Sequence, residues 1–194
     1  MNTTSALPGS GVGAEPPEAL SVLPLTVGTL EVDPPVVLAP MAGVTNRAFR
    51  RLCRGYGAGL YVSEMITARA LVEGNAKTLD MVTFGDDEPY RSVQLYGVDP
   101  VVMQGAVRRL IDDIGVDHID LNFGCPAAKV TRKGGGAALP VHRALLQAII
   151  GATVQAAGSV PVTVKLRLGV DGSHLTFLES GRIAREEGAA AVAL

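Results

Sequence analysis

The sequence has few cysteines and no long apolar run, and both absences narrow the class of protein. Only two of its 194 residues are cysteines, Cys53 and Cys125, which is too few for a disulfide scaffold and lacks C-x-x-C metal-site spacing. No apolar stretch reaches the roughly 18 residues that a membrane helix needs. The amino end lacks the basic segment of a signal peptide. We therefore expect a cytoplasmic protein with reduced thiols and no membrane span.

Positive charge and nucleotide-binding motifs are scarce as well. The formal net charge of −2 excludes a globally basic nucleic-acid binder, although a local basic patch remains possible. There is no Walker A sequence, and no G-x-G-x-x-G turn follows the first predicted strand. The three histidines, His118, His142 and His174, are not spaced like metal ligands, so we assign no metal. Hydrophobic residues make up 47% of the chain, which is enough to build a core.

Short apolar runs alternate with helical patterns along most of the chain. Residues 1–24 are rich in Pro, Gly, Ser and Thr, and we interpret them as a flexible leader. Near-continuous apolar runs are typical of parallel strands buried on both faces, and they lie at 36–40, 60–65, 91–97, 118–126, 161–169 and 189–194. Apolar stripes at helical spacing lie at 45–57, 102–115, 145–158 and 173–188, the first expected to be capped by Thr45.

This alternation predicts an α/β fold of the barrel type. Strict alternation of strands and helices leaves an eight-fold barrel or a doubly wound sheet, and the missing glycine-rich turn favours the barrel. A complete (β/α)8 TIM barrel takes about 250 residues, whereas only about six strand–helix units are present here. We therefore predict that residues 25–194 form a partial TIM barrel that stops before barrel closure, as the amino-terminal part of a longer protein.

Chemically unusual residues gather at the carboxyl ends of the predicted strands. They are Pro40, Met41 and Ala42 in the first, Gln94 in the third, Asn122 and Cys125 in the fourth, and Lys165 and Arg167 in the fifth. Barrel enzymes build their active sites at this face. The pattern therefore points to an enzyme site.

Within this set, Cys125 and Lys165 are the main candidates for chemistry. Cys125 follows a strand in D-L-N-F-G-C-P, whereas Cys53 shares a predicted helix face with Phe49 and is expected to lie in the core. Lys165 lies in an otherwise apolar strand, where it needs an anion, either a salt-bridge partner or an electron-rich ligand. Gln94 offers a donor and an acceptor, which suits the edge of a heterocycle or a satisfied core amide.

Two basic segments are candidates for contact with a polyanion. Arg47, Arg50, Arg51 and Arg54 recur at helical spacing and form either a solvated outer face or an RNA contact. The segment K-V-T-R-K-G-G-G at 129–136 adjoins Cys125. A basic, glycine-flexible loop beside a site suits a phosphate-rich substrate.

Taken together, these residues resemble the tRNA-dihydrouridine synthases, most closely the bacterial DusB-like branch. The resemblance runs from residue 36 to the carboxyl end and rests on five stretches: V-V-L-A-P-M-A-G-V-T-N-R-A-F-R-R-L, Y-V-S-E-M, V-Q-L-Y-G, D-L-N-F-G-C-P-A-A-K-V-T-R-K-G-G-G-A-A-L and V-T-V-K-L-R-L-G. The G-C-P-x-x-K-V block is the most specific of them.

The resemblance implies an FMN-binding barrel followed by a helical tRNA-binding domain. The implied reaction reduces the C5–C6 double bond of uridine in tRNA, with FMN as cofactor, NAD(P)H (NADPH in the family) as transient reductant and Cys125 as proton donor. The implied cofactor contacts are Pro40, Met41, Ala42, Gln94 and Lys165. The implied substrate contacts are Asn122, Arg167, Lys129, Arg132 and Lys133.

Two other readings of the sequence stay open. A small-molecule flavin enzyme of the pyrimidine or orotate dehydrogenase type would share the barrel, the flavin and the cysteine loop, although the basic segment 129–136 favours a polynucleotide. A truncated remnant without catalytic activity is the third reading, because the family's later strands and helical domain lie outside this sequence. Whatever its activity, an open six-stranded barrel would expose an unpaired strand edge and an apolar inner surface, so we expect the isolated chain to fold poorly or associate, and to bind FMN weakly.

Overall fold

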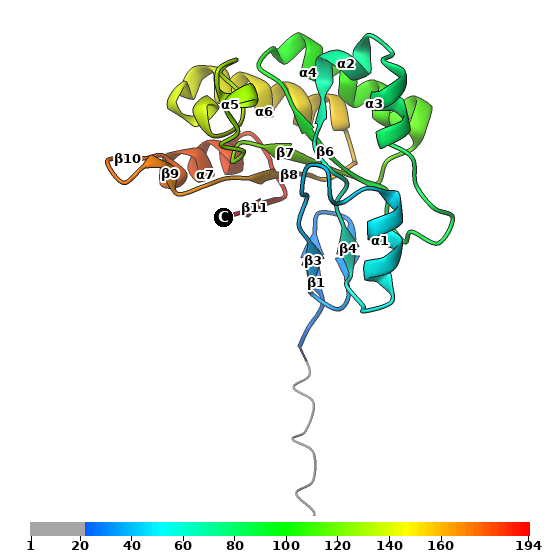
Figure 1. Cartoon of the computed structure of the whole chain (residues 1–194). Helices are drawn as coiled ribbons and strands as arrows, with labels where there is room; N and C mark the ends of the chain where they lie inside the picture. The colour runs from blue at the N-terminus through cyan, green and yellow to red at the C-terminus, as the bar shows by residue number, and fades with distance from the viewer. Residues whose placement is uncertain (1–21) are drawn as a thin grey trace, which may run out of the picture.

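The computed structural model describes residues 22–194, which fold into a parallel sheet with helices packed against it (Figure 1). Each neighbouring pair in the five-stranded sheet is parallel, and its strands are β5 (Ile66–Thr67), β6 (Ser92–Tyr96), β7 (His118–Asn122), β8 (Val162–Lys165) and β11 (Ala191–Ala193). Strands β3 (Val37–Leu38) and β4 (Leu60–Tyr61) form a second parallel pair. A bridge between Val62 and Ser92 joins the chain just after β4 to β6.

Spatial neighbours in the sheet are also neighbours along the chain. Each crossover moves the chain one strand further in the same direction, and the described strands show no reversal of the kind that defines a doubly wound sheet. Each of the six predicted strand segments contains an observed strand. The predicted parallel sheet with alternating strands and helices is therefore confirmed.

Four longer helices correspond to the predicted apolar stripes: α1 (Arg47–Arg54), α4 (Pro100–Arg109) continuing into the π-helical turn η1 (Leu110–Ile114), α6 (Arg143–Ala157) and α7 (Phe177–Glu186). Shorter elements went unpredicted: α2 (Ala68–Val72), α3 (Ala76–Met81), α5 (Ala128–Thr131), the 3₁₀ helix η2 (Gly136–Val141), and the hairpins β1 (Leu25–Val27) with β2 (Leu30–Val32) and β9 (Gly169–Asp171) with β10 (His174–Leu175). Each is too short to display a periodic pattern. The predicted leader lies outside the described residues up to position 21.

Two predicted helix starts are wrong. The side chain of Asn46, not Thr45, caps α1 by accepting a hydrogen bond from the Phe49 amide at 3.0 Å. Thr45 is buried instead, and its hydroxyl oxygen accepts from the Met41 amide at 3.0 Å. Helix α7 begins at Phe177 rather than near Ser173, because the intervening residues pair in the β9–β10 hairpin.

The buried face of α1 is occupied by an arginine rather than by the predicted apolar stripe. Arg50 is fully buried and donates to both carboxylate oxygens of Glu88, at 2.9 and 3.0 Å. Leu52 and Tyr56 are 61% and 85% exposed, and Cys53 is only half-buried. The predictions of a core position for Cys53 and a solvated position for Arg50 are therefore wrong. A guanidinium can be buried when most of its donors find acceptors, and hydrophobic periodicity does not detect that possibility.

The alternation of side chains along β6, β7 and β8 divides the sheet into two unlike faces. One face packs against α4, η1 and α6, which lie together on one side of these strands (Figure 1). Its buried residues are Val93, Leu95, Ile119, Leu121, Val162 and Val164. The opposite face bears polar side chains: Ser92, Gln94, His118, Asp120, Asn122, Thr163 and Lys165. None of the helices in residues 22–194 is long and apolar enough to cross a membrane.

The Arg50–Glu88 pair gives a test of this fold. Substituting Arg50→Met should lower the free energy of unfolding by about 3–5 kcal/mol, because Glu88 is left as an unpaired buried charge. The matched control is Arg182→Ala, which removes the exposed ion pairs of Arg182 with Glu179 and Glu186 on α7 and should cost less than about 1 kcal/mol. Urea unfolding followed by circular dichroism measures both. Equal costs would contradict the assigned role of the buried pair.

Candidate functional site

A cavity of about 310 Å³ opens where β6, β7 and β8 end. Seven of the predicted site residues line it: Pro40, Ala42, Gln94, Asn122, Cys125, Lys165 and Arg167. Met65 lines the same cavity, together with Gly124, Pro126 and Leu166. The structure thus brings together residues from five separate stretches of the chain.

The strand register explains why these residues meet. Gln94 on β6 lies opposite Asp120 on β7, which in turn lies opposite Thr163 on β8. One row further along, Asn122 lies opposite Lys165. Since side chains two residues apart share a face, these rows place the amides and the lysine on the side of the sheet away from α4 and α6.

The Asn122 side chain holds the loop that carries Cys125. Its carbonyl oxygen accepts from the backbone amides of Gly124, at 3.2 Å, and Cys125, at 2.9 Å. Its amide nitrogen donates to Gln94 Oε1 at 2.8 Å and to the sulfur of Met65 at 3.4 Å. The amide is therefore fully engaged within the protein, and contact with a substrate base would have to replace the weak bond to Met65.

Below the cavity, a buried polar network crosses all three strands. Gln94 Nε2 and the Thr163 hydroxyl donate to the two oxygens of Asp120, at 2.7 and 2.6 Å. The ring of His118 lies between the hydroxyls of Ser92, at 2.7 Å from Nδ1, and Thr163, at 3.0 Å from Nε2. Burial raises the pKa of Asp120 to about 6, against the hydrogen bonds from Thr163 and Gln94 and the charge of Lys165. Burial lowers the pKa of His118 to about 4.

Lys165 places a half-buried positive charge at the cavity, in addition to the exposed Arg167. The side chain is half-buried at the end of β8, and among residues 22–194 its ammonium forms no ion pair within 4.0 Å. Asp120 lies one row deeper, close enough for the ammonium to lower its pKa. An ammonium at a half-buried site without an ion-pair partner is suited to an electron-rich ligand.

Backbone packing around Gly136 fixes the far end of the Cys125 loop. The Ala137 amide donates to the Cys125 carbonyl at 3.0 Å, and Gly136 adopts a φ of +56° directly against that carbonyl. The predicted glycine-flexible loop at 129–136 is therefore partly ordered. Residues Ala128–Thr131 form α5, with Val130 fully buried.

The remaining predicted residues lie around the cavity rather than in it. Met41 is 40% exposed and does not line the cavity, although both of its neighbours in sequence do. Lys129 is exposed and lines an adjoining cavity that shares Ala42 and Met65 with the first. Arg132 and Lys133 are exposed on the turn after α5 and line neither.

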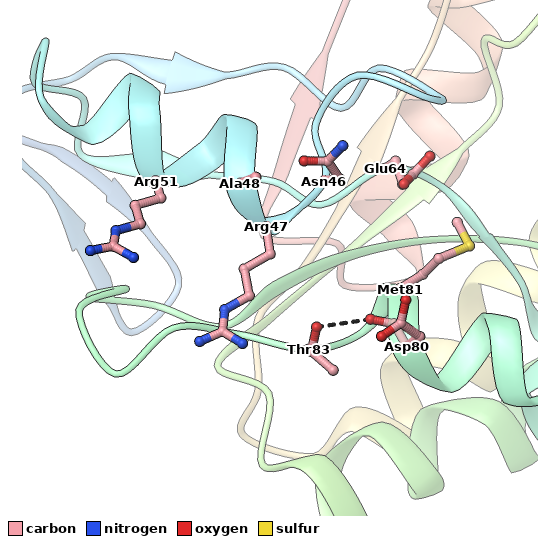
Figure 2. Close-up of a pocket in the computed structure, with 8 residues that line it drawn as sticks. All are labelled: Asn46, Arg47, Ala48, Arg51, Glu64, Asp80, Met81 and Thr83. Atoms are coloured by element: carbon pink, nitrogen blue, oxygen red, sulfur yellow. Dashed lines mark hydrogen bonds between the residues drawn. The ribbon is translucent and has the colours of Figure 1, made fainter.

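A larger cleft of about 630 Å³ lies beside α1 (Figure 2). Arg47 and Arg51 extend from one side of the helix, while Glu64 and Asp80 come from other elements of the wall. None of the eleven predicted catalytic, cofactor-binding and substrate-binding residues lines this cleft, so its size does not make it the chemical site. It shares Asn46, Glu64, Asp80 and Met81 with the adjoining cavity at Lys129, which in turn borders the Cys125 cavity. The three cavities therefore lie next to one another along the same surface.

The sequence analysis missed Met65 and the buried network of Asp120, Thr163, His118 and Ser92. A usable signal was present, because polar residues recur at every second position in S-V-Q, H-I-D-L-N and T-V-K within otherwise apolar strands. No group of three or more His, Cys, Asp or Glu side chains that could hold a metal ion occurs among the described residues.

Comparison with known proteins covers the part of the chain that contains this site. A family model described as dihydrouridine synthase matches residues 37–194. A probable tRNA-dihydrouridine synthase of Mycobacterium tuberculosis is 55% identical over 179 residues, which cover 88% of this chain and 46% of the relative. The tRNA-dihydrouridine synthase B of Pseudomonas aeruginosa is 41% identical over 169 residues, covering 87% and 50%. The chain thus spans about half the length of these curated relatives.

Two glycines of one turn allow a matched test of the Cys125 loop. In Gly136→Ala the new Cβ would overlap the Cys125 carbonyl and lie 2.9 Å from Val130, so backbone movement is required. Gly134 has a similar φ of +77° but no atom within 4 Å of its added Cβ. We expect Gly134→Ala to cost about 1 kcal/mol and Gly136→Ala several times more, with faster alkylation of Cys125. Urea unfolding and thiol labelling with iodoacetamide measure both effects, and equal behaviour of the two variants would contradict this packing.

Folding shifts the pKa values of Asp120 and His118 in opposite directions, which predicts opposing contributions to the pH dependence of the free energy of unfolding. Between pH 4 and 6.5 the unfolded chain binds more protons at His118, since its pKa falls from 6.5 to about 4 on folding, so stability rises with pH. Between pH 3.8 and about 6 the native state binds more protons at Asp120, so stability falls with pH. Asp120→Asn removes only the second contribution. Its free energy of unfolding should rise, relative to wild type, by about 2 kcal/mol from pH 4 to 6, and parallel curves from urea unfolding would refute the linkage.

Proposed function

The chain belongs to the dihydrouridine synthase family, and from that premise we propose that it forms the flavin-binding part of a tRNA-dihydrouridine synthase. The proposed reaction is reduction of the C5–C6 double bond of uridine in tRNA. The observation that carries the proposal is the position of Cys125 at a cavity that also contains the Gln94 amide and the Lys165 ammonium. This arrangement places a proton donor and a cation at the same small cavity.

The sheet order supports a barrel as the parent fold. Strands β3, β4 with β5, β6, β7, β8 and β11 follow one another in space as in the chain, which gives six successive positions. We take these positions as the first six of an eight-stranded (β/α)8 barrel. Sites of such barrels lie at the carboxyl ends of the strands, where Gln94, Asn122 and Lys165 lie here.

The residues present fit a flavin. A half-buried ammonium without an ion-pair partner is suited to the electron-rich pyrimidine side of the ring system, and the Gln94 amide retains one donor hydrogen and one acceptor lone pair beyond its two internal bonds. Pro40 and Ala42 add an apolar wall. When bound here and reduced by NADPH, FMN would supply the hydride for C6 of the uracil, and Pro40, Ala42, Gln94 and Lys165 are the residues that would hold it.

Cys125 is the proposed proton donor for C5. The residue is a free, half-buried thiol on a loop held by Asn122 and by the Ala137 amide. A thiol can act as a general acid in a reaction of this kind. Holding the loop at both ends keeps the sulfur at the cavity while the base enters and leaves.

The rim carries the charge that an RNA backbone requires. Lys129 and Arg167 are exposed beside the Cys125 cavity, and Arg47 and Arg51 flank the larger cleft further along the same rim. A uridine must leave its stack to reach a pocket of this kind, and neighbouring phosphates then need cationic partners. These four side chains are the proposed contacts of the RNA backbone.

The two cysteines supply the test and its control. Cys125→Ala should lower the rate of dihydrouridine formation in tRNA by about 10²–10⁴-fold, because the general acid is lost, while flavin absorbance is retained. Cys53→Ala, on α1 away from the cavity, should keep the wild-type rate. Single-turnover assays with reduced enzyme measure this step, and equal rates in the two variants would reject the role of Cys125. Turnover of free uracil or orotate in preference to tRNA would support the small-molecule dehydrogenase alternative.

A further inference from the structure

An unbroken line of hydrogen bonds runs from the buried end of the sheet to the Cys125 loop. It passes from Ser92 to His118, Thr163 and Asp120, and from there through Gln94 and Asn122 to the backbone amide of Cys125. Every link lies between 2.6 and 3.0 Å. Asp120 is 4% exposed and stands at the centre of the line.

An ionised carboxylate can only accept hydrogen bonds, so Asp120 fixes the direction of each bond above it. Gln94 must present its Nε2 to Asp120, which turns its Oε1 toward Asn122. Asn122 must then present its nitrogen to Gln94, which turns its oxygen toward the amides of Gly124 and Cys125. Reversing either amide would set two donors or two acceptors against each other.

The same constraint acts on the residues below Asp120. The Thr163 hydroxyl gives its only hydrogen to Asp120, so its oxygen must accept from His118 Nε2. The Nδ1 of His118 is then left to accept from the Ser92 hydroxyl. A neutral His118 with its hydrogen on Nε2 is the tautomer that this arrangement requires.

We propose that Asp120 is a positioning residue, whose ionised carboxylate orients the Gln94 and Asn122 amides and thereby holds the Cys125 loop. Its importance for catalysis rests on the proposed function, but the orientation itself does not. Asp120 does not line the Cys125 cavity and acts only through its neighbours. The sequence motifs did not predict a role for Asp120.

The surroundings of Asp120 allow its charge to control the network. The titratable or charged groups facing it are Lys165 on β8 and His118 on β7, while β6 contributes only the uncharged Ser92 and Gln94. The other elements that line the cavity at Asp120 contribute apolar side chains such as Val37, Val62 and Val192. Protonation of Asp120, whose pKa is raised to about 6 by burial, gives it a hydrogen to donate and permits His118 to move its hydrogen to Nδ1.

The first experiment needs no variant. Nitrogen-15 NMR of labelled histidine in the full chain reports which ring nitrogen of His118 carries the hydrogen. We expect the Nε2 tautomer at pH 8. The Nδ1 tautomer at pH 8 would overturn the proposal, because Thr163 would then be unable to donate to an ionised Asp120.

The second experiment compares Asp120→Asn with Glu88→Gln. Asparagine has one donor end and one acceptor end, so one arm of the network must reverse. If the hydrogen bonds of Gln94 and Asn122 reverse, the Cys125 loop loses its anchor, and alkylation of Cys125 by iodoacetamide should accelerate about two- to tenfold. If the hydrogen bonds of Thr163 and His118 reverse instead, His118 changes tautomer. Glu88→Gln makes the same chemical change at another buried carboxylate and should leave both readouts as in wild type.

Unchanged Cys125 labelling together with an unchanged His118 tautomer in Asp120→Asn would overturn the proposal. Equal changes in Glu88→Gln would also overturn it, because they would show a general loss of stability. Peptide mapping separates Cys125 from Cys53 in the labelling assay. Both readouts are independent of flavin and tRNA, so a failure of the proposed reaction and a failure of this network are distinguishable.

Discussion

The two-residue period of three parallel strands is the constraint on which the rest of the structure depends. On β6, β7 and β8 the residues that face the helices, such as Val93, Ile119 and Val164, are apolar, and the residues that alternate with them along each strand are polar. A shift of any of these strands by one residue would bury its polar side chains among the helices and turn its apolar residues to the opposite face. The core and the candidate site are therefore set by a single choice of register.

Burying polar groups on one face is tolerated because the strands satisfy one another. Thr163, Gln94 and Asp120 form one row across the sheet, and each gives or accepts a hydrogen bond along it. Unpaired buried polar groups are costly, so a row of this kind is favourable only when complete. Arg50, on α1, and Glu88 follow the same rule, because the buried guanidinium donates four hydrogen bonds, two to the Glu88 carboxylate and one each to the carbonyls of Thr45 and Thr83.

The charged side chains at the rim of the cavity need no partners within the protein, because they face water. Lys129, Arg132 and Arg167 are exposed. Exposed charges contribute little to stability but determine which ligands approach. The sheet thus holds the buried side chains of the cavity in place, while the exposed cations at its rim are available to a ligand that approaches from solvent.

The sequence by itself determined the order of strands and helices and seven of the residues that line the cavity, since strand ends and local motifs carry those signals along the chain. Only the tertiary structure decided that Arg50 is buried, that Leu52 and Tyr56 are exposed, and that Asp120 connects Gln94 with His118. These features depend on partners 26 to 45 residues away. Periodicity records the face on which a residue lies, but the identity of its partner across the sheet follows from register, which exists only in the folded chain.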